Sequence, residues 1–288
     1  MSFGGIFERV QGLFSSADEY PEFLDEWDDL LDDQMAHWGQ LTDDEQERLV
    51  ALTLHYMNEW KWEATHGFTL TTEMIVLIAA SASMLVLELP FDAYASMRTV
   101  VVSETTMIVN QERAGPGGTV SDAPIAALGH TSQRGPVFLA WDSVQSGASS
   151  SNDGFNVTYH EFAHRLDMSD GLVDGTPILD SEAHYPEWIE ACTKLYEAVR
   201  NGEGPRLLRD YAGTNPAEFF SVATEVFFDK GAAMERDLPD LYAVMLAFYD
   251  QDTAERDRRV RRAQKRTRDN KSRRRKLPVR GASGKRRR

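Results

Sequence analysis

The segment NVTYHEFAHRLD, at residues 156–167, limits the possible folds of this chain more than any other segment. Its apolar residues have the spacing of a buried helix and are Val157, Phe162, Ala163 and Leu166. Asn156 is a suitable N-cap for such a helix. The same helix carries His160, Glu161 and His164, and buried polar groups destabilise a core unless they have partners. The fold must therefore place partners for these three side chains around the helix.

The spacing of the two histidines predicts a metal site. Side chains at positions i and i+4 of a helix point to the same side, so His160 and His164 can bind one ion. Zinc accepts two imidazoles readily, and in catalytic sites it has a third protein ligand and a bound water. Glu161 projects toward the side of that water and can accept its proton as a general base. The alternative is a pair of core histidines with ordinary partners beside a surface acid, but the H-E-x-x-H spacing favours one zinc ion.

A second predicted helix, NPAEFFSVATEVFF at residues 215–228, offers the third ligand. Its apolar residues cover almost the whole circumference, yet Glu218 and Glu225 lie within about 20° of one another around the axis. Two buried carboxylates need a cation nearby, so we expect Glu218 to bind the metal. Asn215, Pro216 and Glu218 also match a capping box, which is the alternative role of Glu218. We expect Glu225 to bond a ligand histidine, the alternatives being an ordinary buried acid or the third ligand itself.

Two more residues are candidates for the site on weaker grounds. Asp167 follows His164 by three residues and could orient an imidazole, or it could be a surface acid at a helix end. Tyr211 precedes the second helix, and its hydroxyl could stabilise an oxyanion. The alternative for Tyr211 is a tyrosine that packs under a loop.

The rest of the chain predicts an α+β fold, mainly helical, with a small β-sheet beside the histidine helix. Thr42 and Glu45 form a capping box at the start of a helix over residues 43–62, and another helix starts at Thr71 or Thr72. Further helices are expected within residues 185–202, 215–231 and 238–252. Strands are expected within 96–109 and 134–144, and loops at 114–124 and 145–155.

Charge divides the chain into three parts: an acidic N-terminal segment at 1–40, a domain at 41–253 and a basic tail at 254–288. The tail holds 18 of the 31 Lys and Arg and three of the 46 Asp and Glu, so it carries +15 and the remainder −30. An acidic body repels nucleic acid and anionic membranes. The tail could contact nucleic acid through phosphates, but we favour a disordered arm that folds back on the body. The acidic surface also raises the hypothesis of adaptation to high salt.

Several features predict a cytoplasmic protein without a membrane span. The longest apolar run, Met74–Leu87, has 14 residues, and a span needs about 20. Glu8 and Arg9 stand where a secretory signal needs apolar residues. With Cys192 as the single cysteine, no intrachain disulfide can form, which fits a reducing compartment.

Together these segments resemble the Mlc titration factor A family, cytoplasmic zinc peptidases related in fold to the catalytic domain of anthrax lethal factor. The resemblance covers about residues 40–250. It rests on the segments GPVFLAW (135–141), GFNVTYHEFAHRLD (154–167), YAGTNPAEFFSVATEVFF (211–228) and MIVLIAASASMLVLEL (74–89). It implies that residues 41–253 form a zincin-type metallopeptidase domain.

The resemblance also implies roles for individual residues. His160, His164 and Glu218 would be the zinc ligands and Glu161 the catalytic base, so Glu218 is favoured over Glu225 as third ligand. The family combines aminopeptidase activity toward short peptides with binding to the glucose-responsive repressor Mlc. The residues for zinc chemistry are present in the sequence, whereas no surface for a repressor can be recognised in it.

Two functions follow as hypotheses. The first is a zinc peptidase, an aminopeptidase by resemblance, in which the GPVFLAW segment is an edge strand that pairs with the substrate backbone. The second is a metal-stabilised binding module that sequesters a transcriptional repressor, with little essential catalysis. Replacing Glu161 separates the two, because only the first needs a general base.

Overall fold

The computed structural model describes residues 23–65, 67–105, 108–109, 113–114, 120–121, 125–126, 135–150 and 153–276. Its helices are α2 (Asp25–Gln34), α3 (Asp43–Glu59), α4 (Thr72–Leu85), α5 (Trp141–Ser149), α6 (Val157–Asp167), α7 (Tyr185–Arg200), α8 (Pro216–Asp229), α9 (Gly231–Asp237), α10 (Pro239–Tyr249) and α11 (Thr253–Lys276). Short 3-10 helices are η1 (Trp38–Gln40), η2 (Met168–Asp170), η3 (Glu182–His184) and η4 (Asp210–Gly213).

The strands are few and short. A three-stranded parallel sheet has the order β1 (Lys61–Ala64), β2 (Thr99–Ser103), β7 (Val137–Ala140), with Lys61 opposite Thr99 and Val100 opposite Val137. Two antiparallel pairs join β3 (Ile108–Val109) to β6 (Ile125–Ala126) and β4 (Arg113–Ala114) to β5 (Val120–Ser121). The fold is thus mainly helical with a small sheet, as predicted, and β7 is an edge strand of the three-stranded sheet.

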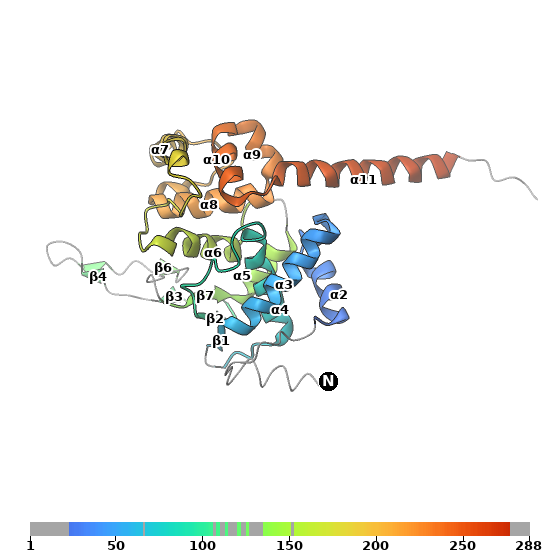
Figure 1. Ribbon diagram of the computed structural model, residues 1–288, viewed down its shortest axis with the longest axis horizontal. Coiled ribbons are helices and arrows are strands. Elements are labelled where there is room, and N and C mark those ends of the chain that lie inside the picture. The colour runs from blue at the N-terminus through green and yellow to red at the C-terminus, as the bar shows by residue number, and fades with distance from the viewer. Residues whose placement is uncertain are drawn as a thin grey trace, which may run out of the picture.

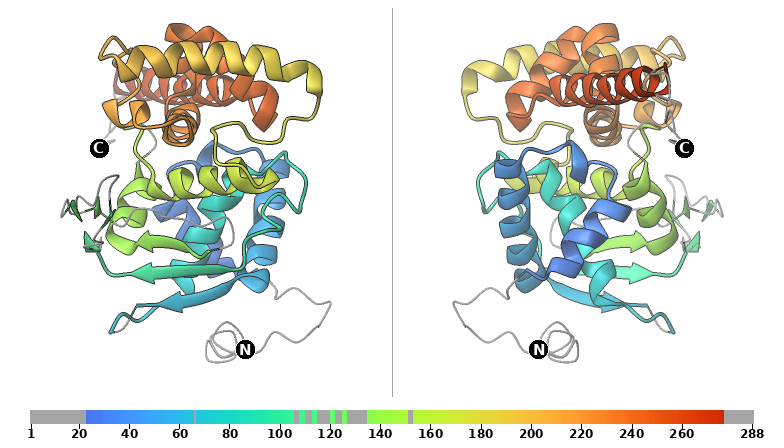
Figure 2. Two further views of the ribbon diagram at one scale, coloured as in Figure 1. Left: turned by 90° about the vertical axis from the view of Figure 1, so that its left-hand side faces the viewer. Right: turned by 90° about the vertical axis from the view of Figure 1, so that its right-hand side faces the viewer.

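The elements stack in layers around α6. Figures 1 and 2 show the sheet on one side of α6 and α8 on the other, with α7, α9 and α10 beyond α8. The α6 and α8 helices pack directly against one another, and α4 also contacts α6. Aromatic side chains join these layers: the ring of Phe162 on α6 stacks on that of Trp60 at 5.1 Å between centroids. This packing fixes the face of α6 that meets α8, which is where the predicted site lies.

Local sequence explains the two N-terminal helices. The capping box that starts α3 is formed, because Thr42 Oγ1 accepts a hydrogen bond from the Glu45 amide and the Glu45 carboxylate accepts one from the Thr42 amide. Almost every residue of α4 is buried, and its Ser81 and Ser83 hydroxyls donate to carbonyls one turn back. The apolar run is therefore a core helix, and no described helix is long and apolar enough to span a membrane.

The prediction of a strand continuing to 144 and a loop at 145–155 is wrong, because residues Trp141–Ser149 form α5. Serine and glycine in this segment disfavour a helix locally. Tertiary contacts outweigh that preference: a Cβ at Gly147 would lie 3.1 Å from Asn156 Cα, and the Asn156 side chain donates to the Gly147 carbonyl. The helix is thus held against the start of α6. The predicted loop at 114–124 lies largely outside the described residues.

The packed unit begins before residue 41, which corrects the predicted N-terminal boundary. Within the acidic segment, Trp27 and Leu31 of α2 are 1% and 0% exposed. They lie four residues apart, so both point from one face of α2 into the core, and α2 contacts α4. The acidic side chains of α2 occupy its solvent side and conceal this apolar stripe in the composition.

The prediction of a disordered tail from residue 254 is also wrong for most of its length, because α11 extends from Thr253 to Lys276. Ala254 and Arg256 at its start are buried. The Arg256 guanidinium binds the Glu45 carboxylate at 3.0 Å, and that of Arg259 binds the same carboxylate at 3.3 Å. Residues 277–288 lie outside the described part.

Candidate metal centre

The α6 helix holds both predicted histidine ligands in the core. Asn156 caps the helix as predicted, accepting a hydrogen bond from the Tyr159 amide at 3.1 Å, and all residues of α6 are buried. The rings of His160 and His164 lie one turn apart with centroids 4.9 Å from each other. Both project from the face of α6 that packs on α8.

The α8 helix brings Glu218 to these rings. Asn215 caps α8 by accepting from the Glu218 amide at 3.0 Å, so the backbone of Glu218 belongs to the helix start. Its side chain instead faces the histidines, with Oε2 2.9 Å from His160 Nε2 and 3.4 Å from His164 Nε2. The structure therefore forms only the Asn215 half of the predicted capping box, since the Glu218 carboxylate turns to the histidines.

The donor set fits a single metal ion. One ligand atom from each of His160, His164 and Glu218 lies within 4.8 Å of the others. Two imidazole nitrogens and a carboxylate oxygen are the ligands of many catalytic zinc sites, and three protein ligands leave a position for water. These three form the one group of three metal-ligating side chains within the described residues.

Glu161 lies beside this donor set, and one of its carboxylate oxygens has no hydrogen-bond partner among the described residues. Its side chain is 1% exposed, and the oxygen in question is Oε2. Burial raises the pKa of Glu161, although the charges of His160 and His164 act to lower it. A buried carboxylate whose pKa is raised is suited to accept and then donate a proton.

Glu225 forms a hydrogen bond with His160, the contact that we expected for it. It is fully buried, and its Oε1 accepts a hydrogen bond from His160 Nδ1 at 2.7 Å. Its other oxygen accepts from the Asn156 amide at 2.8 Å. With Nδ1 bonded to Glu225, the opposite ring nitrogen of His160 points to Glu218. Burial acts to lower the pKa of His160, but its hydrogen bonds to Glu218 and Glu225 raise it to about 10.

Sequence reasoning missed Arg209, which supplies the cation that Glu225 needs. Its guanidinium binds both oxygens of Glu225, at 2.5 and 3.0 Å, and also donates to the Gly154 carbonyl. It lies over the Phe155 ring at 4.9 Å from the centroid. The signal was present, because a buried acid on α8 requires a positive partner and Arg209 precedes α8 in the same segment as Tyr211.

Tyr211 reaches the site from η4. Its ring centroid lies 5.9 Å from that of His160, and its side chain remains 44% exposed. Burial of the hydroxyl and the nearby Glu218 raise its pKa, so the hydroxyl remains a hydrogen-bond donor over the usual pH range. The packing alternative for Tyr211 does not describe a ring that is nearly half exposed.

Asp167 does not form the predicted contact. It is fully buried, so the surface alternative is wrong, and burial raises its pKa to about 6. The structure contains no hydrogen bond between Asp167 and the His164 ring, whose Nδ1 has no partner among the described residues. The charge of His164 nevertheless lies close enough to act on the pKa of Asp167.

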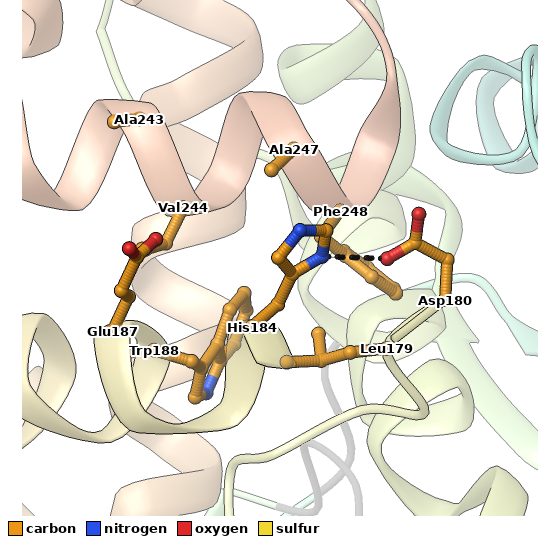
Figure 3. A pocket seen from close by; sticks show the side chains of 9 residues that line it. All are labelled: Leu179, Asp180, His184, Glu187, Trp188, Ala243, Val244, Ala247 and Phe248. Atoms are coloured by element: carbon orange, nitrogen blue, oxygen red, sulfur yellow. Dashed lines mark hydrogen bonds and ion pairs between the residues drawn. The ribbon is translucent and has the colours of Figure 1, made fainter. Parts of the chain in front are cut away.

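Two hollows in the structure differ in whether candidate metal ligands line them. One, of about 260 Å³, opens at the metal centre and is lined by Phe155, Val157, His160, Glu161, Arg209, Tyr211 and Glu225. The other, of about 100 Å³, lies between the start of α7 and α10 (Figure 3). There His184 binds Asp180 at 2.7 Å, with no third metal ligand converging on them in the described part. Of these two hollows, only the larger combines apolar residues with side chains of the candidate centre, namely His160, Glu161 and Glu225.

Comparison with known proteins places these features in a family. The chain is 30% identical over 261 residues to the uncharacterized protein slr2042 of Synechocystis sp., covering 85% of this chain and 95% of that protein. It is 28% identical over 244 residues to Mlc titration factor A of Serratia proteamaculans, covering 83% and 92%. It is 30% identical over 235 residues to Mlc titration factor A of Salmonella gallinarum, covering 80% of this chain and 87% of that protein. A family model for the glucose-regulated metallo-peptidase M90 matches residues 15–250, and the chain belongs to this family.

Proposed function

We propose that this chain is a zincin-type peptidase that binds one zinc ion through His160, His164 and Glu218. The observation that carries the proposal is the convergence of these three ligand atoms within 4.8 Å beside the buried carboxylate of Glu161. Membership of a metallopeptidase family supports it. The mixed nitrogen and oxygen donor set favours zinc over the oxygen-preferring ions magnesium and calcium.

Zinc in such a site supplies a Lewis acid that lowers the pKa of water and polarises a carbonyl. Glu161 accepts the proton of the attacking water and transfers it to the leaving amine nitrogen. The Tyr211 hydroxyl, whose ring lies beside that of His160, donates to the oxyanion. Glu225 and Arg209 act on none of the reacting atoms. They hold the His160 ring in one orientation, and Glu225 also ties it to the start of α6.

The substrate is proposed to bind as an extended peptide. The β7 strand has a neighbour on one side only in the three-stranded sheet, so its other edge can pair with a peptide backbone. An apolar side chain next to the cleaved bond fits the 260 Å³ hollow beside Phe155 and Val157. We propose short peptides with a free N-terminus, and hence aminopeptidase activity, as the preferred substrates.

The test combines metal analysis with two peptide series. Purified protein is expected to contain about one zinc per chain and to hydrolyse peptides with a free N-terminus faster than the same peptides with an acetylated one. Equal rates for both series would replace the aminopeptidase proposal by an endopeptidase. Protein that folds but binds no stoichiometric zinc would refute the enzyme itself.

A second function is supported by the names of the relatives, which are called titration factors of the repressor Mlc. We propose, as the alternative, that this chain binds a transcriptional repressor of that kind, which would place it in the cytoplasm. A Glu161→Gln variant separates the two. It should retain repressor binding and lose turnover if both functions exist, and it should lose nothing if the metal only stabilises the fold.

A further inference from the structure

The α11 helix consists of an anchored part and a projecting part. Its first turns are fixed to the body by ion pairs: Arg258 binds Glu235 of α9, and Arg256 and Arg259 bind Glu45 of α3. Arg259 also donates to the Gln40 carbonyl at 2.7 Å. Figure 1 shows the later turns of α11 running away from the body. With a rise of about 1.5 Å per residue, residues 264–276 extend roughly 20 Å.

The projecting part, residues 264–276, is called the basic arm below. It contains eight Lys or Arg and one acid, Asp269, and it contains no apolar residue. At about 100° per residue, the eight basic positions are distributed around the whole circumference of the helix. A further five Lys or Arg follow in residues 277–288. Basic positions therefore occur on every side of the helix axis.

The acidic body does not neutralise this charge. Residues 1–253 carry −30, but screening at physiological salt limits the reach of exposed charges to about 8 Å. The arm extends beyond that distance. The sequence favoured an arm that folds back on the body, but the helical backbone runs away from it. The body acids Glu45 and Glu235 pair with the anchored part of α11.

We propose that the basic arm binds double-stranded nucleic acid through backbone phosphates, without sequence preference. A duplex presents one negative charge per about 1.7 Å of its axis, and its major groove admits a single α-helix between two rows of phosphates. A helix that is basic all round matches that environment. Repulsion of phosphates by the −30 body restricts the contact to the arm.

The composition of the arm argues against an anionic membrane as its partner. A helix that lies in a membrane interface needs an apolar face to insert below the headgroups, in addition to a basic one. Residues 264–276 lack such a face altogether. Nucleic acid needs no apolar contact, because phosphate contacts and counterion release provide the binding free energy.

The experiment measures fluorescence anisotropy of a labelled 24-base-pair duplex with the full chain between 50 and 200 mM salt. The arm variant carries Lys265→Gln, Arg268→Gln, Lys271→Gln and Arg274→Gln, which keep helix propensity. We expect wild-type affinity to fall steeply with salt. The arm variant should bind about tenfold or more weakly at 50 mM, and the slope of log affinity against log salt should decrease by up to about 3.6.

A matched control removes four basic residues that are exposed on the body: Lys61→Gln, Lys194→Gln, Arg200→Gln and Arg236→Gln. It has the same net charge as the arm variant and should keep wild-type binding and slope. Equal loss in both variants, or no binding by wild type at 50 mM, would overturn the proposal. So would tighter binding to phosphatidylserine vesicles or polyglutamate than to the duplex, which would indicate a membrane or an acidic protein as partner.

Discussion

Two clusters of buried ionisable side chains lie between α6 and α8, and they differ in charge. At the metal centre, His160 and His164 meet Glu218 and Glu225, and Arg209 binds Glu225. At the end of α8, Asp229 lies 3.6 Å from His37, whose ring also contacts the Phe228 carbonyl and the Tyr159 hydroxyl. Both clusters pair histidine with acid, yet only in the first do two histidines and a carboxylate converge.

The second cluster can be neutral at pH 7. Burial raises the pKa of Asp229 to about 8 and lowers that of His37 to about 4. An uncharged histidine and a protonated acid need no ion for charge balance, and the ring nitrogens of His37 bond the Phe228 carbonyl and the Tyr159 hydroxyl. At the metal centre, despite burial, hydrogen bonds to Glu218 and Glu225 instead raise the pKa of His160 to about 10, so this histidine is charged at pH 7. The comparison teaches that burial of a histidine and an acid does not itself indicate function. The convergence of three ligand atoms does.

Of the variants that test this comparison, the one that removes a proposed zinc ligand should have the largest effect. Glu218→Gln keeps the shape of the side chain and removes its charge, so zinc affinity should fall by more than the 10–100-fold typical for loss of an outer hydrogen-bond partner. Competition with a chromophoric chelator measures the affinity. A normal affinity would show that Glu218 is a helix-capping residue only.

Glu225→Gln should have the next largest effect. It leaves the ligands in place but weakens the bond to His160 Nδ1 and leaves Arg209 without its partner, so zinc affinity should fall about 10–100-fold. Glu187→Gln, an exposed acid on α7, is the matched control and should leave affinity unchanged. A larger loss for Glu225→Gln than for Glu218→Gln would identify Glu225 as the third ligand.

Asp229→Asn tests the neutral cluster. The folded-state pKa of about 8 lies above the ordinary 3.8, so the contribution of Asp229 to stability is complete below pH 4 and is lost as pH rises through 8. The variant should be more stable than wild type by about 1–2 kcal/mol at pH 8.5 and nearly equal at about pH 4, as measured by urea unfolding. Asp240→Asn, exposed on α10, should show no such difference between the two pH values.

Tyr159→Phe should have the smallest effect. Tyr159 precedes His160, but its hydroxyl contacts His37 Nδ1 at 3.2 Å and so belongs to the other cluster. Loss of one buried hydrogen bond should cost about 1 kcal/mol in the free energy of unfolding, with zinc content and turnover unchanged. A drop in turnover comparable to that of a ligand variant would show that the two clusters are coupled.

The sequence predicted those parts of the site that depend on helix periodicity. The spacing of His160 and His164 and the common face of Glu218 and Glu225 follow from helix geometry, and the structure brings these side chains together. Arg209 and the His37–Asp229 pair were missed, because their partners are set by tertiary packing between distant segments. Likewise α5 forms despite its serines because Gly147 packs on Asn156, a contact that periodicity cannot indicate.

In the fold, too, local sequence predicted some elements, whereas others depend on tertiary contacts. The capping box predicted the start of α3, and the apolar run predicted α4 as a core helix. The acidic N-terminal segment and the basic tail were interpreted from their composition alone. Composition does not reveal the apolar stripe of α2 or the ion pairs that anchor α11. Composition averages over both faces of a helix, whereas one buried face is enough to fix it to the core.

The most direct test of the proposed chemistry is peptide turnover by the Glu161→Gln variant at zinc content matched to wild type. If Glu161 is the general base, turnover should fall about 10²–10⁴-fold while one zinc per chain remains bound. Wild-type turnover in a variant that holds its zinc would contradict the assignment of Glu161 and the mechanism built on it.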